Sequence, residues 1–461
     1  MLYQRLAPCL ESQQPAEQAG FRKGFSTIDH IFTLSQIQEK AAEWNVEIWV
    51  AAIDFMKAFD TVSHEGIWVS LLQQGVAHGY IELLKRLYSQ QAGTVRFDGK
   101  RSKKFEIQRG TKQGDPLSTL LFNSLLEHIF QQITTTWSRK KLGLEISLGV
   151  TEYLTNLRFA DDVLLFARSK HGMAKMMKDL SEVAASYGLQ MQPDKSKILT
   201  NSTSLRSLST SRMLRVGAMD VEILPVEGSV KYLGRKVSFD VHNQVEFENR
   251  LAAAWGCFAK YKEELTNRKY SLATRLRLFN ATVTVTALYG SETWVLRKED
   301  ERRLKTTQRK MLRMVLCCKR RKVPGVAGST AVEDDNEDVL EPWKDFFERT
   351  ARLVEDQLAT AGQEEWNAAW RKRQWNWAGK VLDENSNKWS RKAARWQPLL
   401  HSSSSSARRR ARPKKRWSDD LVDFMHVTTG AEKTDLNKMA KLLKGSWSEL
   451  GDAYVSHFMS K

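Results

Sequence analysis

The sequence predicts an α+β fold in its first half and a helical second half. Two observations lead to this prediction. Up to about residue 245, short apolar runs with β-branched residues alternate with segments whose apolar residues recur every three or four positions. Beyond that point the helical spacing continues and the strand pattern stops. With 461 residues, the chain is long enough for about three domains or subdomains.

Composition and charge restrict the class of protein. The chain carries 72 Lys and Arg against 54 Asp and Glu, a net charge of +18, which favours polyanionic partners such as nucleic acid. No apolar run is long enough for a membrane span, and the N-terminus lacks the apolar core of a signal peptide. The four cysteines show no CxxC spacing, which argues against a zinc finger or a disulfide framework. We therefore expect an intracellular protein, in the nucleus or cytoplasm, with no membrane anchor and no disulfide-linked partner.

The first elements are a helix and a buried strand. Ser26 and Asp29 form a capping-box pattern that opens the helix. The strand is expected over Val46–Ile53, a short apolar run with several β-branched residues. It ends directly before Asp54, which places a carboxylate at the end of a buried strand.

Two helices and a hairpin are expected next. Ser63 caps a helix that stops near Gly75, and a second helix covers 80–89. The following strands, 94–97 and 105–108, are joined through Asp98-Gly99, a typical hairpin turn.

The run Leu157–Phe166 predicts two apolar strands with Asp161 and Asp162 at the turn between them. A long helix over 117–132 comes before it, and a helix over 173–187 follows. Bare carboxylates between apolar strands are costly unless a cation pairs with them. A pair of divalent metal ions would do so, because Mg²⁺ prefers carboxylate oxygens. Taken alone, the two acids fit a polar turn without catalytic function equally well.

The second half divides into a helical region, a break and a basic end. Residues 247–318 follow helical spacing, and Lys319–Glu341 looks like a linker because it combines charge runs with Pro and Gly. Ser402–Ser406 and the basic run Arg408–Arg416 form a segment that we expect to be flexible.

Basic residues and tryptophans concentrate near the C-terminus. Between Arg371 and Arg416, fifteen Lys and Arg occur with only two acids, and seven of the fifteen tryptophans lie between Trp366 and Trp417. Three interpretations are open: aromatic stacking on nucleic acid, tryptophans filling a small helical core, and a nuclear-targeting patch. We favour tryptophans in a core and basic residues on nucleic acid.

Six motifs follow one another in an informative order. They are GFRKGFST (20–27), IDFMKAFDTV (53–62), RGTKQGDPLSTLLFN (109–123), FADD (159–162), GLQMQPDKSK (188–197) and KYLG (231–234). Together they resemble the second fingers motif and palm motifs A to E of the reverse transcriptases of non-LTR (LINE-type) retrotransposons. YGSETW (289–294) and RARPKKRWSDD (410–420) resemble the downstream part of the same family.

The resemblance implies a right-hand polymerase fold. Its expected parts are partial fingers (1–45), a palm with an antiparallel sheet and helices (46–240), a helical thumb-like region (241–320), a linker (321–342) and a Trp-rich, basic helical C-terminal region (343–461) with a flexible segment (401–416). Family members have an upstream fingers motif, and many carry an endonuclease domain before it. We therefore expect the sequence to be truncated at its N-terminus. The family's WAGH reads WAGK here, with Lys380 in place of His.

The resemblance also implies catalytic roles. Asp54, Asp161 and Asp162 match the carboxylates that hold two Mg²⁺ ions, with Mn²⁺ as the alternative, during nucleotidyl transfer. Lys195 matches a lysine that assists the leaving pyrophosphate, although a solvated surface lysine is the alternative. Phe59 matches the ring beneath the incoming sugar, which favours dNTPs over ribonucleotides, and a core phenylalanine is the alternative.

The other matched residues form two binding sets. Nucleotide contacts are expected from Phe59, Arg22, Gln113 and Gly114, and primer or template contacts from Lys23, Tyr232, Leu233 and Gly234. The expected function is an RNA-directed DNA polymerase with an RNA template, a DNA primer or target, and dNTPs. The alternative is a truncated, catalytically inactive nucleic-acid-binding remnant of the same fold. An RNA-templated RNA polymerase is a third possibility, and Phe59 argues against it.

Overall fold

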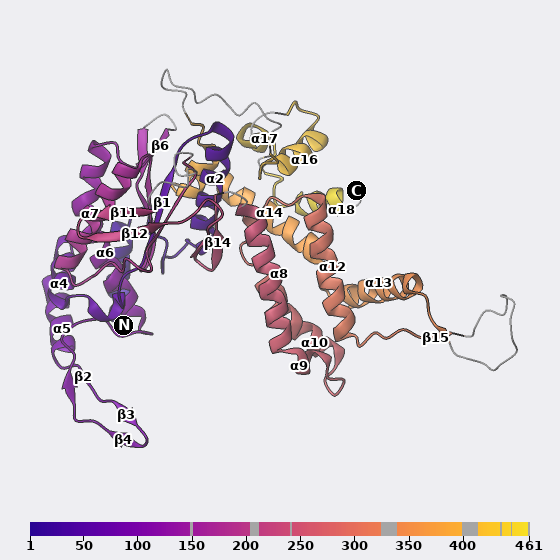
Figure 1. Cartoon of the computed structure of the whole chain (residues 1–461), viewed down its shortest axis with the longest axis horizontal. Helices are drawn as coiled ribbons and strands as arrows, with labels where there is room; N and C mark the ends of the chain where they lie inside the picture. Colours follow the sequence, from indigo (N-terminus) through magenta and orange to yellow (C-terminus); the bar gives the residue numbers. More distant parts are fainter. Residues whose placement is uncertain are drawn as a thin grey trace, which may run out of the picture. The chain divides into compact units, whose positions relative to one another are not determined.

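The computed structural model describes residues 1–147, 151–202, 212–239, 242–323, 339–398, 414–433, 436–443 and 445–459. The chain forms two compact units, coloured along the sequence in Figure 1. The first unit consists of Met1–His242 and Val381–Lys414, and the second of Asn243–Lys380 and Lys415–Lys461. The C-terminal residues are thus divided between the units.

A six-stranded sheet forms the centre of the first unit. In spatial order its strands are β11 (Met213–Val216), β12 (Met219–Ile223), β10 (Lys197–Thr200), β1 (Trp49–Ile53), β9 (Asp162–Ala167) and β8 (Asn156–Phe159). All neighbours are antiparallel except β10 and β12, which are parallel. Strand β1 begins three residues later than the expected Val46. The reason is local: the Val46 N–H donates to Ala41 O and closes the preceding helix.

The helices of the first unit are α1 (Leu2–Gln13), α2 (Thr27–Trp44), α3 (Ala58–Thr61), α4 (His64–Gln73), α5 (His78–Ser89), α6 (Pro116–Arg139), α7 (Lys170–Ser186) and α15 (Trp389–Arg395). Four of them, α2, α4, α6 and α7, begin at side-chain caps. Ser26 and Asp29 form the expected capping box before α2. The Asp115 carboxylate accepts from Leu117 N–H at 2.9 Å before α6, with Pro116 as first helical residue.

Both faces of the sheet are buried. Trp49, Ala51 and Ile53 of β1 pack into a core with α4, α6 and α7. Val50, between them, faces the opposite way, into a second core with residues of α2. Covering on both sides explains why this strand reads as a continuous apolar run rather than an alternating one.

A segment from the far end of the chain completes the second core. Helix α15 packs along α2, and its Trp389 and the following Trp396 are buried beneath the sheet. The Lys40 ammonium donates to the carbonyls of Ala393 and Ala394, 2.7 and 2.6 Å away, and so binds the C-terminal end of α15. These two tryptophans are thus buried in a core, but in the core of the sheet unit and not in the small helical core that the sequence analysis considered.

The first unit also contains smaller antiparallel pieces outside the central sheet. Strands β13 (Val230–Tyr232) and β14 (Arg235–Val237) form a tight hairpin. Residues 92–106 form a ribbon of four two-residue strands, β2 (Ala92–Gly93), β3 (Arg96–Phe97), β4 (Lys100–Arg101) and β5 (Phe105–Glu106). The expected Asp98-Gly99 turn is present. The pair β6 (Leu144–Ser147) and β7 (Thr151–Leu154), and strands β11 and β12, were not predicted.

The second unit is helical. Its main helices are α8 (His242–Lys260), α10 (Leu272–Phe279), α12 (Lys298–Val315), α13 (Trp343–Thr360), α14 (Trp366–Leu382), α16 (Asp419–Thr429), α17 (Leu436–Leu442) and α18 (Gly451–Met459). Its core is strongly aromatic: the Phe279 and Trp366 rings stack at 6.0 Å, and Trp375 stacks on Trp447 at 4.1 Å. Tryptophans therefore fill this core too.

Two expected features lie outside the described residues. They are most of the linker, residues 324–338, and residues 401–413, which include the serine tract and much of the basic run. Among the described residues, none of the helices has the length and apolar character required to cross a membrane.

Candidate active site

The sheet register brings three aspartates together at one end of the neighbouring strands β1 and β9. Strand β1 pairs with β9 so that Ile53 lies opposite Val163, and the next position therefore sets Asp54 opposite Asp162. Asp161 belongs to the two-residue turn between β8 and β9, because Phe159 pairs with Asp162. The ends of two buried strands and one tight turn thus hold the three carboxylates that the sequence analysis singled out.

The charges of these carboxylates affect one another. Desolvation by the surrounding protein, followed by the charges of Asp161 and Asp54, raises the pKa of Asp162 to about 6, while Lys231 opposes the shift. Burial and the charge of Asp54 also raise the pKa of Asp161. Both residues are exposed as a whole, so it is their carboxyl groups that lose hydration near the sheet. A cation placed among the three would relieve this repulsion.

The turn between β8 and β9 has a strained backbone. Ala160 has φ +56°, in the region that favours glycine. The N-terminal segment holds it there: a Cβ on Gly20 would lie only 2.5 Å from Ala160 N. Only glycine allows this approach, so the first motif packs directly on the turn that carries Asp161.

A buried amide network fixes the same contact. The Gln18 side-chain carbonyl accepts from Gly20 N–H at 2.8 Å and from Ala160 N–H at 3.3 Å. Its amide donates to Asn123 Oδ1 at 3.2 Å, and the Asn123 amide donates to Gly20 O at 2.9 Å. The sequence analysis missed Gln18 and did not single out Asn123, although both lie in or beside matched motifs.

Asp54 is positioned by the segment before β10. Its N–H donates to Ser196 Oγ at 3.1 Å, and its carbonyl accepts from Gln192 N–H at 2.8 Å. The Ser196 side chain is buried, whereas Lys195 is exposed on the turn just before it. Lys195 therefore lies next to the residue that holds Asp54, and its assistance to a leaving group stays a prediction.

The Phe59 ring is half-buried and stacks on Phe122 of α6, with centroids 4.4 Å apart. Its carbonyl accepts from Thr111 N–H at 2.7 Å, and this bond joins the α3 turn to the loop before α6. A Cβ on Gly110 would lie 2.6 Å from Asp60 O, so this loop also needs a glycine. The contacts are compatible with both interpretations of Phe59, the ring beneath the sugar and the core residue.

Gln113 and Gly114 lie at the exposed tip of this loop. Gly114 has φ +88°, and the Gln113 amide reaches Asp60 Oδ1 only at 3.5 Å, the limit of a hydrogen bond. Their contact with a nucleotide stays a prediction.

The β13–β14 hairpin packs against the aspartate side of the sheet. Tyr232 is buried, and its hydroxyl lies 3.1 Å from His30 Nδ1 of α2. Burial and the charge of Asp162 raise the pKa of Tyr232, which places this ring within electrostatic reach of the carboxylates. Leu233 and Gly234 form the turn with φ +47° and +75°, a conformation costly for leucine.

Arg22 and Lys23 differ in their surroundings. The Arg22 guanidinium donates to the carbonyls of Gln18 and Gln14 at 2.7 and 2.9 Å, and it packs over the Phe25 ring. These bonds hold the N-terminal segment in place, so a phosphate would compete with them for the same donors. Lys23 is exposed.

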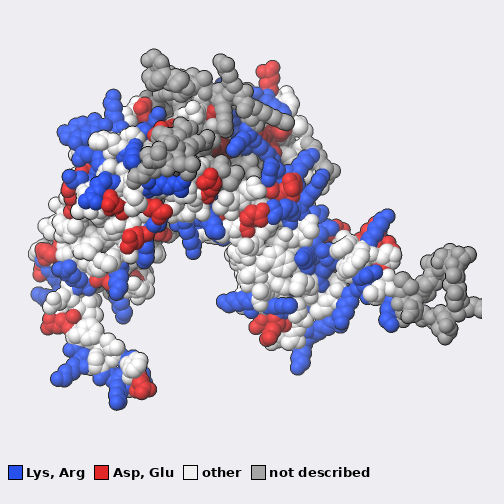
Figure 2. Space-filling view, in the orientation of Figure 1, with Lys and Arg blue, Asp and Glu red and all other residues white. Residues whose placement is uncertain are grey.

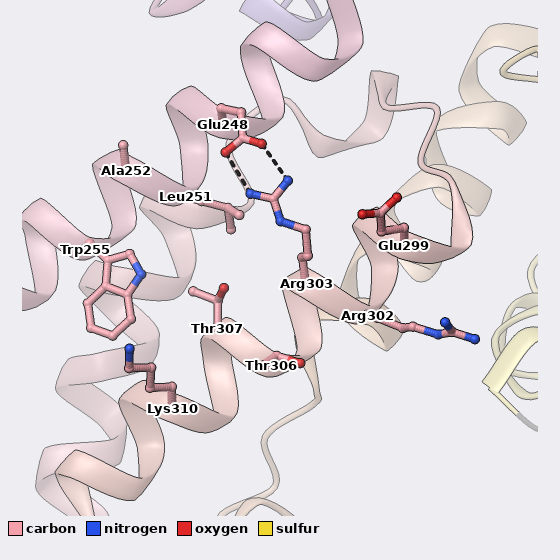
Figure 3. A pocket seen from close by; sticks show the side chains of 10 residues that line it. All are labelled: Glu248, Leu251, Ala252, Trp255, Glu299, Arg302, Arg303, Thr306, Thr307 and Lys310. Carbon is pink, nitrogen blue, oxygen red and sulfur yellow. Dashed lines mark hydrogen bonds and ion pairs between the residues drawn. The ribbon is translucent and has the colours of Figure 1, made fainter.

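A separate pocket of about 530 Å³ lies between α8 and α12 in the second unit (Figure 3). On one side the two terminal nitrogens of Arg303 donate to the two carboxylate oxygens of Glu248, at 2.5 and 2.8 Å. On the other, the Lys310 ammonium lies 5.5 Å from the Trp255 ring centre. The pocket therefore combines an ion-paired wall with a cation–aromatic pair.

The two downstream motifs meet within the second unit. Trp417 is buried and donates from Nε1 to Glu292 O at 2.7 Å. The Lys415 ammonium donates to Leu296 O at 3.0 Å and pairs with Asp420 at 2.8 Å. These motif residues are therefore part of the packing of this unit.

No group of three His, Cys, Asp or Glu side chains in the described ranges is arranged to hold a metal ion. The three aspartates nevertheless offer only carboxylate oxygens, the ligands that hard divalent cations prefer. The chemistry of the donors and their mutual repulsion thus fit a divalent cation, while the side chains are not arranged as a closed site.

Comparison with known proteins identifies the family. The family model for reverse transcriptase (RNA-dependent DNA polymerase) matches residues 1–237, just over half of the chain. The chain belongs to the reverse transcriptase family. The predicted right-hand polymerase fold and the likeness to non-LTR retrotransposon enzymes are confirmed.

Three relatives come from insect elements. A Pol polyprotein of the R2DM element of Drosophila melanogaster is 28% identical over 189 residues, 40% of this chain. An R2 polyprotein of Popillia japonica is 33% identical over 174 residues, 36% of this chain. A probable RNA-directed DNA polymerase from transposon X-element of Drosophila melanogaster is 26% identical over 328 residues, 68% of this chain. The matches span 17%, 23% and 33% of these relatives.

Among solved structures, telomerase from Candida albicans in complex with a fragment of telomeric RNA is similar with a TM-score of 0.42 and 12% identity. The match covers 68% of this chain and 56% of the telomerase chain.

Proposed function

We propose that this chain is an RNA-directed DNA polymerase of the non-LTR retrotransposon type, which extends a DNA primer with dNTPs on an RNA template. The observation that carries the proposal is the register of β1 and β9, which sets Asp54 opposite Asp162 and beside Asp161. Membership of the reverse transcriptase family supports it. Because the matched relatives are much longer than this chain, the activity is proposed here for the chain itself.

We propose that Asp54, Asp161 and Asp162 hold two Mg²⁺ ions, with Mn²⁺ as a substitute. When bound, such ions lower the pKa of an attacking hydroxyl and stabilise the charge that develops on phosphate oxygens. The raised pKa of Asp162 supports this role, because a carboxylate ionised against its neighbours gains most from a cation.

The surrounding residues position the reactants. In our proposal the β13–β14 hairpin holds the primer end next to Asp162, and the rigid Leu233-Gly234 turn presents its backbone there. Phe59, fixed by its stacking on Phe122, limits the room beneath the incoming sugar. Most of the catalysis then comes from positioning and electrostatics.

The remaining proposed contacts involve charged and polar side chains. Gln113 and Gly114, at the tip of the loop before α6, contact the nucleotide, and exposed Lys23 contacts template phosphates. Arg22 would have to leave its carbonyl partners to bind a phosphate, so we assign it to the stability of the fingers segment. Lys195 stabilises the leaving pyrophosphate.

The second candidate function is a nucleic-acid-binding remnant without catalysis. The net charge of +18 supports it, because a basic chain can bind a nucleic-acid strand with or without catalysis. In that case the chain binds template and does not extend a primer.

The deciding experiment is extension of a DNA primer on an RNA template with dNTPs and Mg²⁺. The parent chain should extend the primer, and Asp161→Asn with Asp162→Asn should abolish extension without loss of template binding. Glu182→Gln, which removes an exposed acid on α7, is the control and should retain activity. Template binding without extension by the parent would reject the polymerase and support the remnant.

A further inference from the structure

The ribbon formed by residues 92–106, which we call the basic arm, is almost wholly exposed. It extends beyond the end of α5, where Figure 1 labels β2, β3 and β4. Except for the half-buried Gly93, every residue of the arm is exposed, and Phe97, next to its tip, is 82% exposed. Such a ribbon has too little core of its own, which suggests that it serves a partner.

The charge of the arm is strongly positive. It carries Arg96, Lys100, Arg101, Lys103 and Lys104 and only two acids. Within the part of the chain that the structure describes, none of these five cations takes part in an ion pair. Figure 2 shows the resulting basic surface along the ribbon.

The register of the arm places two arginines side by side. The turn residues Asp98 and Gly99 both have positive φ, as a two-residue hairpin turn requires, so Phe97 and Lys100 form its closing pair. Arg96 and Arg101 form the next pair, which in this alternation is not hydrogen-bonded and brings side chains closest.

The following pair confirms the alternation. Val95 and Ser102 are again hydrogen-bonded, with Ser102 N–H donating to Val95 O at 2.9 Å. Lys103 is exposed two residues after Arg101, at the point where one extra residue shifts the register between the Arg96–Arg101 and Gly93–Phe105 pairs. Like charges directly opposite each other destabilise a hairpin unless an anion lies between them.

We propose that the basic arm binds the phosphate backbone of a nucleic-acid strand, with Arg96, Arg101 and Lys103 on phosphates. Phosphates provide what this face lacks, namely negative charge at short and repeated intervals. Phe97, on the opposite face, offers a ring to a sugar or base. This site lies outside the three aspartates, requires no metal, and would exist whether or not the chain polymerises DNA.

The test measures binding of labelled nucleic acid by fluorescence anisotropy over a range of salt concentrations. Separate arms use single-stranded RNA, single-stranded DNA and an RNA–DNA duplex. Replacing Arg96, Arg101 and Lys103 together with Gln should lower the slope of log affinity against log salt by about 2 to 3 for the preferred ligand, because each phosphate contact contributes about 0.7 to 0.9. An unchanged slope for all three ligands would reject the proposal.

A matched variant controls for net charge. Arg139, Lys140 and Lys141, exposed at the end of α6, are replaced together with Gln, which removes the same number of charges. This control should retain most of the slope. Equal losses in the two variants would mean that binding depends on overall charge and would overturn a specific role for the arm.

Amide hydrogen exchange can be measured on the parent chain, so its result does not depend on how a substitution affects folding. Bound nucleic acid should slow exchange of the arm amides, including Ser102 N–H, and no protection would count against the proposal.

The Asp161→Asn variant distinguishes the proposal for the basic arm from the proposed polymerase function. It should bind through the arm with the parental slope, even though it lacks any primer extension that the parent shows. If an acidic protein were the true partner, nucleic acid would leave the arm unprotected.

Discussion

Burial and the charges of Asp161 and Asp54 oppose the ionisation of Asp162. Its pKa of about 6 lies above the ordinary 3.8, so the folded chain holds this proton more tightly than the unfolded chain does. The stabilisation from that proton is fully present below about pH 3.8 and is lost as the pH rises through 6. Asp162→Asn, neutral throughout, should therefore raise the Tm at pH 8 and change it little near pH 4. Thermal unfolding by circular dichroism, without divalent metal, measures both.

The same variant tests cation binding without any assay of catalysis. Adding Mg²⁺ at pH 8 should raise the Tm of the parent, because a bound cation stabilises the folded state. The rise should be smaller in Asp162→Asn and unchanged in Glu182→Gln. Equal shifts in all three chains would show that the ion acts elsewhere.

Gly20 is a single-residue test of the strained turn. Gly20→Ala brings a Cβ against the Ala160 backbone at 2.5 Å, so the turn or the N-terminal segment must move. We expect a loss of primer extension well beyond the loss of stability, since a small misplacement of reacting groups is costly. Gly79→Ala is the control, because a Cβ there meets open space and favours helix α5. Equal activity in the two variants would contradict the turn's role.

At the scale of elements, helix α15 packs on α2 and stabilises the second core of the first unit. Trp389 is only 4% exposed and packs among residues of α2 and the sheet. Trp389→Ala should lower the free energy of unfolding by about 3 to 5 kcal/mol, as for other buried large-to-small changes. Trp343→Ala, at a tryptophan that is 58% exposed, should cost far less. Urea unfolding measures both free energies, and similar losses in the two variants would contradict the stabilising role of α15.

Local elements were largely predictable from the sequence. The strand that ends before Asp54, the Asp98-Gly99 turn and the Ser26–Asp29 capping box all depend on neighbours in the chain, which the sequence displays. The contact of Gln18 with Asn123 joins residues 105 positions apart, and neither residue carries a local signal of it. Motif order could reveal which segments belong to the site, but not the amide network that fixes them together.

Arg22 shows a further limit of motif matching. An arginine in a matched fingers motif predicts a phosphate contact, yet here its donors face main-chain carbonyls. The same five N–H groups satisfy either partner, so residue type alone cannot distinguish the two roles.

At the scale of the whole molecule, the order of segments along the chain does not match their assignment to the two units. Residues 381–414 follow the bulk of the second unit in sequence but belong to the first. A fragment of residues 1–242 should therefore expose the part of the second core that α15 covers beside α2, and bind hydrophobic dyes. Joining 381–398 to it through a flexible linker should restore a cooperative thermal transition. Identical transitions in the two fragments would show that the sheet does not need this cover.

This connectivity also has a consequence during synthesis. When the ribosome has completed the central sheet at Ile223, Trp389 and Trp396, which help to cover one side of it, are still about 170 residues from being made. Translation at about 5 to 20 residues per second leaves the part of that apolar side beside α2 uncovered for about 9 to 35 seconds. Part of the second core of the nascent chain therefore stays exposed to solvent until its own C-terminal part arrives. Slower translation would prolong this vulnerable interval, and faster translation would shorten it.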